Sequence, residues 1–490
     1  MKKSVNGVFT FLEGQPVYKI ENYDAMENFF MTITSASDIW NFCWSYGGLT
    51  AGRIDSNHAI FPYYTADKVS DAASYTGPYT CVKAKKNGQT FIWEPFSSFN
   101  CSASVKAVQD KKLVRNIYKN YNGSRVWFEE INSELELLFR YSWTSSEKYG
   151  IVRTVHVENL GNDKVDLSIL DGCRNILPAC CTSDFQNSNS VLLDAYKKTD
   201  LDEESNLVEF SVSSIVSDKA EPNEGLYANT CWFSTADKIS LDTEAPSKFV
   251  EDETIDYSNV SKGKRSSVYI NPKFQLDKKE SKEWIQIFDT YLTLTKIKEL
   301  KKSISDKKDT VNDLLADIEK GNETLTNYIA QADGIQDTRN KMACLHHQQN
   351  VMFNIMRGGI FVDDGKIDLK DFILFISQRN KELSKIAKEY FSQVSNQELT
   401  YSELSELVEK TNIPQFKRLF LEYMPLTFSR RHGDPSRPWN SFNIKLKDNN
   451  GNSILNYEGN WRDIFQNWEA LSLSFPAFIN GIIAKFLNAK

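Results

Sequence analysis

Four polar side chains lie close together near residue 465 and could bind a ligand through hydrogen bonds. They are Arg462, Asp463, Gln466 and Asn467. If a helix begins near Trp461, residues four apart stack on one face, which groups Arg462 with Gln466 and Asp463 with Asn467. A sugar needs such an array, because each hydroxyl removed from water costs about 1–3 kcal/mol unless it finds a partner. The alternative is a network of capping and salt-bridge contacts that only stabilises the helix end.

A polar loop precedes this segment at residues 428–440, which contain three arginines, a histidine and a tryptophan. Turns at its glycine and prolines are expected to hold it in a fixed shape, and binding residues often collect on such loops. We select Arg437 and Trp439 as candidate substrate contacts. The alternative is a buried turn in which the arginines pair with Asp434 and with nearby carbonyls.

The remaining reactive side chains do not form a recognisable metal or nucleophile motif. His346 and His347 are adjacent, so on a helix they diverge by about 100° and do not grip one ion. The acidic segment 363–368 is similar to a calcium loop, but Ile360 and Val362 occupy the first and third ligand positions. The sequence also lacks a phosphate-binding P-loop, a Gly-x-Ser-x-Gly motif and zinc spacing. We therefore expect no metal site and no cofactor.

The composition is that of a folded protein that binds neutral molecules. Hydrophobic residues make up 41% of the 490 residues, and the formal net charge is −7. Without a surplus of Lys and Arg, a nucleic-acid or anionic-membrane partner is not expected. No apolar run reaches the roughly 18 residues of a membrane span, and the first residues lack the apolar core of a signal peptide. We predict a cytoplasmic protein, in which the eight scattered cysteines are free thiols.

From the start to about residue 290, short alternating runs are separated by clusters of Gly, Asn, Asp and Ser, which is typical of antiparallel strands. We predict one hairpin from 151–158 with 165–169, and another from 125–131 with 134–141. The polar stretches 198–225 and 240–265 are interpreted as loops, and 283–290 as the last strand. So many strands indicate a large antiparallel β-sandwich over residues 1–292.

After residue 296 the spacing of apolar residues becomes helical. Two helices, the second ending at Gly321, would form a linker over residues 293–335. Helices are then predicted at 338–356, 369–391, 401–410, 415–423 and 461–487, the last with a break at Pro476. A hairpin is predicted at 443–455, within a helical domain of residues 336–490.

This order of sandwich, helical linker and helical domain resembles that of the inverting glycoside phosphorylases of the cellobiose phosphorylase type. The segment from Arg462 to Asn467 looks like the Arg-Asp-x-x-Gln-Asp segment of that family's (α/α)6 barrel. In the family, the arginine and the final aspartate hold the sugar whose bond is broken. Asn467 replaces that aspartate by a neutral amide. The segment 45–48, followed by Arg53, is similar to the family's Gly-rich strand and basic segment near a loop that reaches toward the active site.

The resemblance implies an α+β multidomain protein with a large antiparallel β-sandwich, linker helices and the first part of an (α/α)6 barrel. Twelve barrel helices and their connections need about 200 residues or more, which exceeds the length of 333–490. We therefore expect the chain to be an amino-terminal fragment, with the general acid of the family beyond Lys490.

The implied activity is inverting phosphorolysis of β-glucan-type oligosaccharides. A protonated carboxyl assists the leaving sugar while inorganic phosphate, the co-substrate, attacks the opposite face. The family also implies a homodimer. Two alternatives remain open: an inverting glycoside hydrolase, which needs a second carboxylate, and a glycan-binding module without chemistry.

Overall fold

The computed structural model describes residues 3–86, 88–97, 112–214, 227–235, 238–431, 433–437, 439–448 and 451–488. The chain forms two compact units. The first comprises Met1–Glu323 and Gly433–Ser441, and the second comprises Thr324–His432 and Phe442–Lys490. The first unit is built mainly from antiparallel sheets and the second mainly from helices, so the protein is of the α+β class.

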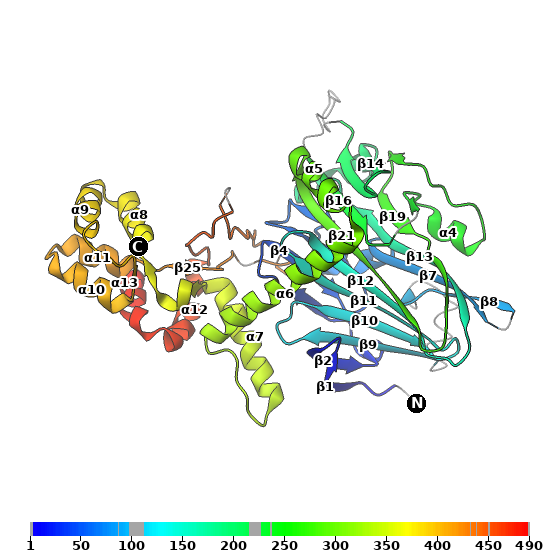
Figure 1. Cartoon of the computed structure of the whole chain (residues 1–490), viewed down its shortest axis with the longest axis horizontal. Coiled ribbons are helices and arrows are strands. Elements are labelled where there is room, and N and C mark those ends of the chain that lie inside the picture. The colour runs from blue at the N-terminus through cyan, green and yellow to red at the C-terminus, as the bar shows by residue number, and fades with distance from the viewer. Residues whose placement is uncertain are drawn as a thin grey trace. The chain divides into compact units, whose positions relative to one another are not determined.

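The larger sheet of the first unit contains eleven strands among the described residues, and its middle strands run side by side in Figure 1. In spatial order they are β1 (Asn6–Leu12), β2 (Gln15–Glu21), β9 (Leu113–Asn120), β10 (Val126–Asn132), β11 (Leu137–Ser146), β12 (Gly150–Asn159), β21 (Ser281–Thr293), β16 (Tyr227–Phe233), β15 (Leu207–Val212), β14 (Lys197–Asp202) and β18 (Val260–Lys262).

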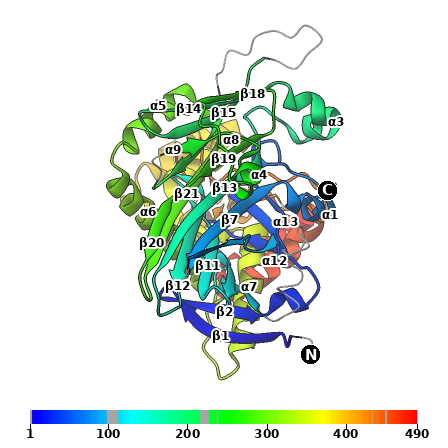
Figure 2. The same cartoon turned by 90° about the vertical axis from the view of Figure 1, so that its right-hand side faces the viewer.

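Two further sheets complete this unit. The first is formed by β17 (Ile239–Ser240), β19 (Ser266–Ile270), β13 (Val165–Ile176), β7 (Gly77–Lys86) and β8 (Gln89–Trp93), with β20 (Lys273–Leu276) also paired to β13. The strands β19, β13 and β7 are seen together in Figure 2. The second contains β3 (Phe30–Ile33), β4 (Ile39–Trp44), β5 (Leu49–Arg53) and β6 (Ala59–Phe61).

One hydrophobic core joins all three sheets. Alternate residues of each strand point inward, as the period of a strand requires. Val155 and Phe288 from the larger sheet, Ile169 from the second and Phe61 from the third are all fully buried in it. Short helices occur at η1 (Tyr23–Ala25), α1 (Ala66–Asp71), η2 (Ala72–Ser74), α3 (Ser183–Asp194) and α4 (Ala245–Val250).

One of the two predicted hairpins is confirmed and the other is wrong. Strands β10 and β11 pair directly, with Glu129 opposite Arg140. The predicted partners 151–158 and 165–169 lie in different sheets, because β12 pairs with β11 and β21 whereas β13 pairs with β7, β19 and β20. The turn between them therefore carries the chain from one sheet to the other. Asn159 holds it by accepting from Gly161 N at 2.9 Å and donating to Asp163 O at 2.7 Å.

The loops predicted at 198–225 and 240–265 are wrong in part. The first range contains most of β14 and β15, and the second contains α4 and β18. Strand β18 is the edge strand of the larger sheet and β14 lies next to it, and near a sheet edge solvent-facing polar residues weaken the alternation of a strand. Residues 215–225 of the first range lie outside the described residues.

The linker helices are α5 (Leu294–Ser303) and α6 (Lys307–Gln331). Helix α6 continues through Gly321, so the predicted end at this glycine is wrong. Nothing lies within 4 Å of the position that a Cβ on Gly321 would take, and a glycine in a helix interior costs only about 1 kcal/mol. Apolar side chains of both helices, Ile297 and Leu314 among them, pack against Trp232 and Ile287 of the larger sheet.

The second unit contains seven described α-helices after α6, two 3-10 helices, η4 (Val362–Gly365) and η5 (Pro476–Phe478), and two short strand pairs. The α-helices are α7 (Lys341–Gly358), α8 (Leu369–Arg379), α9 (Lys381–Phe391), α10 (Tyr401–Lys410), α11 (Pro414–Glu422), α12 (Trp461–Ser474) and α13 (Ile479–Asn488). The strand pairs are β22 (Ile360–Phe361) with β25 (Leu426–Thr427), and β23 (Ile367–Asp368) with β24 (Glu398–Leu399). Within the described range, no helix combines the length and apolar character needed to cross a bilayer.

Most of the helix predictions for this unit are confirmed, including the break at Pro476. The single helix predicted at 369–391 is wrong, because it is interrupted at Asn380. The Asn380 side chain accepts hydrogen bonds from Glu382 N and Leu383 N, and it thereby starts α9 as an N-cap. In the predicted hairpin at 443–455, Lys447 forms a β-bridge with Ser453, whereas Asn443 forms its β-bridge with Arg431, outside the hairpin. Residues 449 and 450 lie outside the described residues.

Candidate functional site

Helix α12 begins at Trp461, as the sequence predicts, but its four polar residues face different surroundings. Arg462 and Asp463 form an exposed ion pair, with Nε and Nη2 each 3.0 Å from a carboxylate oxygen. Gln466 is exposed. Asn467 is buried, and its amide donates to Asn354 Oδ1 of α7 at 2.9 Å. Arg462, Asp463 and Gln466 therefore face solvent, whereas Asn467 lies in the contact between α12 and α7. The role of these four residues as sugar ligands stays a prediction.

The loop at 428–440 is divided between the two units. Arg430 is buried, with its guanidinium 4.6 Å from the centre of the Phe428 ring, and both residues belong to the second unit. Arg437 and Trp439 belong to the first unit, where both are exposed and Trp439 retains 77% of its surface. Asp434 accepts hydrogen bonds from Ser436 N through its side chain and from Arg437 N through its carbonyl.

This part of the loop is fixed to the first unit by its backbone. Ala66 N, at the start of α1, donates to Pro435 O at 2.9 Å. The predicted contacts Arg437 and Trp439 therefore lie in one unit, and the predicted contacts on α12 lie in the other. The ligand role of Arg437 and Trp439 also stays a prediction.

The Gly-rich segment 45–48 connects β4 to β5 in a tight turn. Gly47 and Gly48 have φ values of 96° and 89°, a region that favours glycine. A Cβ on Gly48 would lie 2.4 Å from Val69 O, so the turn approaches the backbone of α1 too closely for any side chain. Ser45 donates from Oγ to Asn28 Oδ1 at 2.8 Å, which fixes the other side of the turn.

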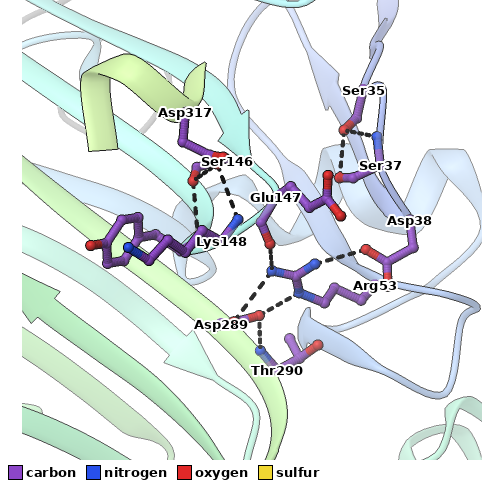
Figure 3. Close-up of polar contacts among 11 residues, drawn as sticks. Ser35, Ser37, Asp38, Arg53, Ser146, Glu147, Lys148, Asp289, Thr290 and Asp317 are labelled. Carbon is purple, nitrogen blue, oxygen red and sulfur yellow. Dashed lines mark hydrogen bonds and ion pairs between the residues drawn. The ribbon is translucent and has the colours of Figure 1, made fainter. Parts of the chain in front are cut away.

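Arg53, at the end of β5, is held from three directions (Figure 3). Its Nε donates to Asp289 Oδ1 at 2.5 Å, Nη1 to Asp38 Oδ1 at 2.7 Å and Nη2 to Glu147 O at 2.8 Å. Burial lowers the pKa of Arg53, but the two carboxylates more than offset this and hold the pKa above its usual range. Since every nitrogen of the guanidinium already has a partner, Arg53 joins β5 to β21 and to neighbouring turns rather than binding a ligand.

A second polar cluster in Figure 3 joins α6 to the turn between β11 and β12. Asp317 accepts from Ser146 Oγ at 2.5 Å and from Lys148 N at 3.0 Å. Lys148 also forms an ion pair with Asp313, which lies one helical turn before Asp317 on α6. These contacts fix the helix on the sheet.

A cavity of about 140 Å³ lies in the first unit, and the turn at 45–48 forms part of its wall. Polar atoms reach it from Glu94 and from Arg174 on β13. Burial and the neighbouring Cys81 and Glu94 raise the pKa of Tyr79, so its hydroxyl stays protonated and donates to Glu94 Oε1 at 2.8 Å. The aromatic lining residues are Tyr23, Tyr46, Tyr79, Phe96, Phe128 and Tyr141.

Sequence reasoning did not find this cavity, because its walls come from segments that are far apart in the chain. The segment 45–48, selected by its resemblance to a family segment, forms part of the wall, but the resemblance did not predict a cavity. In the portion of the chain that the structure describes, no group of three His, Cys, Asp or Glu side chains is arranged to hold a metal ion. The described cysteines are free thiols, most of them buried, and Cys101 lies outside the described residues.

Residues 361–425, which extend from β22 through α11 almost to β25, match the family model for glycoside hydrolase family 149 insertion domain 1. No curated protein matches the chain. This match concerns a single segment of the second unit.

Several solved structures show a distant likeness to the chain. A bacterial glucoamylase complexed with acarbose is 8% identical, over 94% of this chain and 67% of that one, with a TM-score of 0.38. A protein assigned as a kojibiose phosphorylase, from the human microbiome, is 8% identical over 81% of this chain and 45% of that one, with a TM-score of 0.33. A polysaccharide lyase is 10% identical over 57% and 34%, with a TM-score of 0.30. The chain spans less than half the length of the latter two proteins.

Proposed function

We propose that the protein is a carbohydrate-active enzyme that cleaves β-glucan-type oligosaccharides by inverting phosphorolysis. The observation that carries this proposal is the match of residues 361–425 to an insertion domain of a glycoside hydrolase family. The resemblance of the Arg462–Asn467 segment to a sugar-binding motif adds to it. Arg462 and Asp463, both accessible at the start of α12, are the residues that we propose as sugar contacts.

The proposed reaction needs one protonated carboxyl and inorganic phosphate. The carboxyl gives its proton to the oxygen of the leaving sugar, while a phosphate oxygen forms a bond to the anomeric carbon from the opposite face. Because phosphate is already negatively charged, no base is required to activate it. Phosphate is thus a co-substrate, no further cofactor is proposed, and the family resemblance suggests a homodimer.

Inverting hydrolysis is the second candidate, favoured by the description of the matched family as a glycoside hydrolase family. Water is a weaker nucleophile than phosphate and needs a second carboxylate as a general base. The two reactions differ in product, because only phosphorolysis releases a sugar phosphate.

The test is an assay of the protein, expressed from its complete gene, with cello-, laminari- and sophoro-oligosaccharides. Each sugar is incubated with and without inorganic phosphate, and both sugar phosphate and free reducing sugar are measured. The proposal predicts a sugar phosphate that forms only when phosphate is present. Phosphate-independent release of reducing sugar would support hydrolysis, and binding without either product would support a non-catalytic glycan-binding module.

A further inference from the structure

We propose that the cavity in the first unit binds a single neutral sugar ring, with Arg174 and Glu94 as its hydrogen-bonding residues. The site requires no bond cleavage, so it goes beyond the proposed enzymatic activity and does not depend on it. Four features of the cavity carry the inference: its size, its aromatic walls, the free donors of Arg174 and the free acceptor of Glu94.

The size of the cavity suits one six-membered ring. Its volume is about 140 Å³, and a cavity of about 150 Å³ in another protein is large enough for benzene. Ser74, which is exposed, forms part of its rim. A ring held inside could therefore extend its substituents toward solvent.

Aromatic rings supply flat apolar walls. The rings of Phe128 and Tyr141 are stacked with their centres 5.0 Å apart, and Phe96 meets Tyr141 edge-on at 5.4 Å. These contacts fix the orientation of the rings before any ligand arrives. A rigid ring with a polar edge can cover the C–H face of a sugar while leaving its hydroxyls to other partners.

Arg174 is the residue that indicates a ligand. Among the described residues, its side chain has no hydrogen-bond or ion-pair partner, and its guanidinium lies 4.8 Å from the centre of the Tyr79 ring. The buried arginines Arg115 and Arg153 each form an ion pair, with Glu130 and Asp171 respectively. Because Arg174 lines the cavity, the outer nitrogens of its guanidinium can donate charged hydrogen bonds to a ligand there.

Glu94 makes a neutral sugar a better occupant than an anion. Its Oε1 accepts from Tyr79, whereas no described residue donates to its Oε2. A sugar hydroxyl can donate to this oxygen and accept from Arg174 at the same time. A phosphate ion could accept from Arg174, but it would also be repelled by the Glu94 carboxylate.

The experiment is titration calorimetry of the protein with glucose, cellobiose, laminaribiose and inorganic phosphate as separate probes. We expect saturable binding of at least one sugar. Arg174→Met should keep the packing on Tyr79 but weaken that binding at least about tenfold, since it removes charged hydrogen bonds. Ser74→Trp should obstruct the rim and weaken binding as well.

The matched control is Arg265→Met. Arg265 is also stacked on a tyrosine, 5.3 Å from the ring centre of Tyr75, but it does not line the cavity. This variant should bind sugar with unchanged affinity. Melting temperatures of all three variants establish that each is folded before its affinity is compared.

Three results would overturn the proposal: no sugar binds, the Arg174 and Arg265 variants lose affinity equally, or phosphate binds in an Arg174-dependent manner while sugars do not. Arg174-dependent sugar binding in a protein that turns over no oligosaccharide would support the cavity assignment and contradict the proposed enzymatic activity. The two proposals can therefore fail separately.

Discussion

Asp171, on β13, is a buried carboxylate that accepts hydrogen bonds from three other side chains. It accepts from two nitrogens of Arg153 at 2.8 Å each, from Thr80 Oγ1 at 2.6 Å and from Trp284 Nε1 at 2.8 Å. Neither charge is accessible to solvent. The pair therefore depends on both partners being present.

We predict that Asp171→Asn lowers the free energy of unfolding by about 3–5 kcal/mol, because it leaves the Arg153 charge buried and uncompensated. Urea unfolding measures the change. The control is Asp252→Asn, which removes an ion pair between Lys83 and a side chain that is 87% exposed and should change stability little. Equal losses in the two variants would show that burial does not set the strength of the Arg153–Asp171 pair.

We predict that Arg462 and Asn467, two polar residues of α12, have different roles, the first in sugar binding and the second in stability. Arg462→Met is expected to leave the melting temperature unchanged, since the side chain is 75% exposed, and to weaken oligosaccharide binding. Asn467→Ala is expected to lower the free energy of unfolding by about 0.5–1.5 kcal/mol, because it removes the hydrogen bond to Asn354. Thermal melting and sugar affinity should be measured for both variants. A large loss of stability with normal sugar binding in Arg462→Met would assign that residue to the structural network instead.

The sequence allowed the helical position of these residues to be predicted, because stacking at four-residue spacing follows from helix geometry. It did not indicate which neighbour Asn467 contacts, since α7 is about a hundred residues away in the chain. Glu94 and Arg174 were missed for the same reason. They lie on separate segments that only the order of strands in the sheet brings to one cavity.

The turn between β4 and β5 offers a direct test of backbone geometry. Gly48→Ala should be strongly destabilising, because the new Cβ would lie 2.4 Å from Val69 O. Gly14→Ala is the matched control, since Gly14 also has a positive φ of 77° but nothing lies within 4 Å of its Cβ position. Melting temperatures should fall much further for Gly48→Ala than for Gly14→Ala. Similar decreases would mean that φ alone, and not the close approach to α1, requires glycine here.

Local sequence patterns predict which segments are strands or helices, but not which elements lie side by side or where a side chain starts a new helix. Alternation identified β12 and β13 as strands, but it carries no information about which strand lies beside each, and so the turn at Asn159 was interpreted as a hairpin. At Asn380 the side chain caps a new helix, although apolar spacing continues across it. The sequence predicts that α6 ends at Gly321, yet the helix continues through this glycine, whose Cβ position has open space around it.

Helix α5 and the part of α6 up to Glu323 belong to the first unit, and the domain boundary at residue 292 stays a prediction. Helices α5 and α6 cover Trp232, Ile285 and Ile287 of the larger sheet. We predict that a chain ending at Glu323 is more stable than one ending at Leu292. The shorter chain exposes apolar side chains of the sheet to water, and each large one loses about 1.5–3 kcal/mol of the stabilisation that its burial provides. Urea unfolding of the two truncated chains provides the measurement. Equal stability would support the boundary at 292.

The central proposal concerns the whole protein. It is that phosphate cleaves a β-glucan-type oligosaccharide with inversion at the anomeric carbon. The most direct measurement is NMR spectroscopy of the products during incubation with laminari- and cello-oligosaccharides in phosphate buffer. The account predicts that the first sugar phosphate to appear is the α-anomer, because attack opposite a β-linked leaving group inverts that carbon. A β-anomeric sugar phosphate would contradict inversion, and free sugar without any sugar phosphate would contradict phosphorolysis.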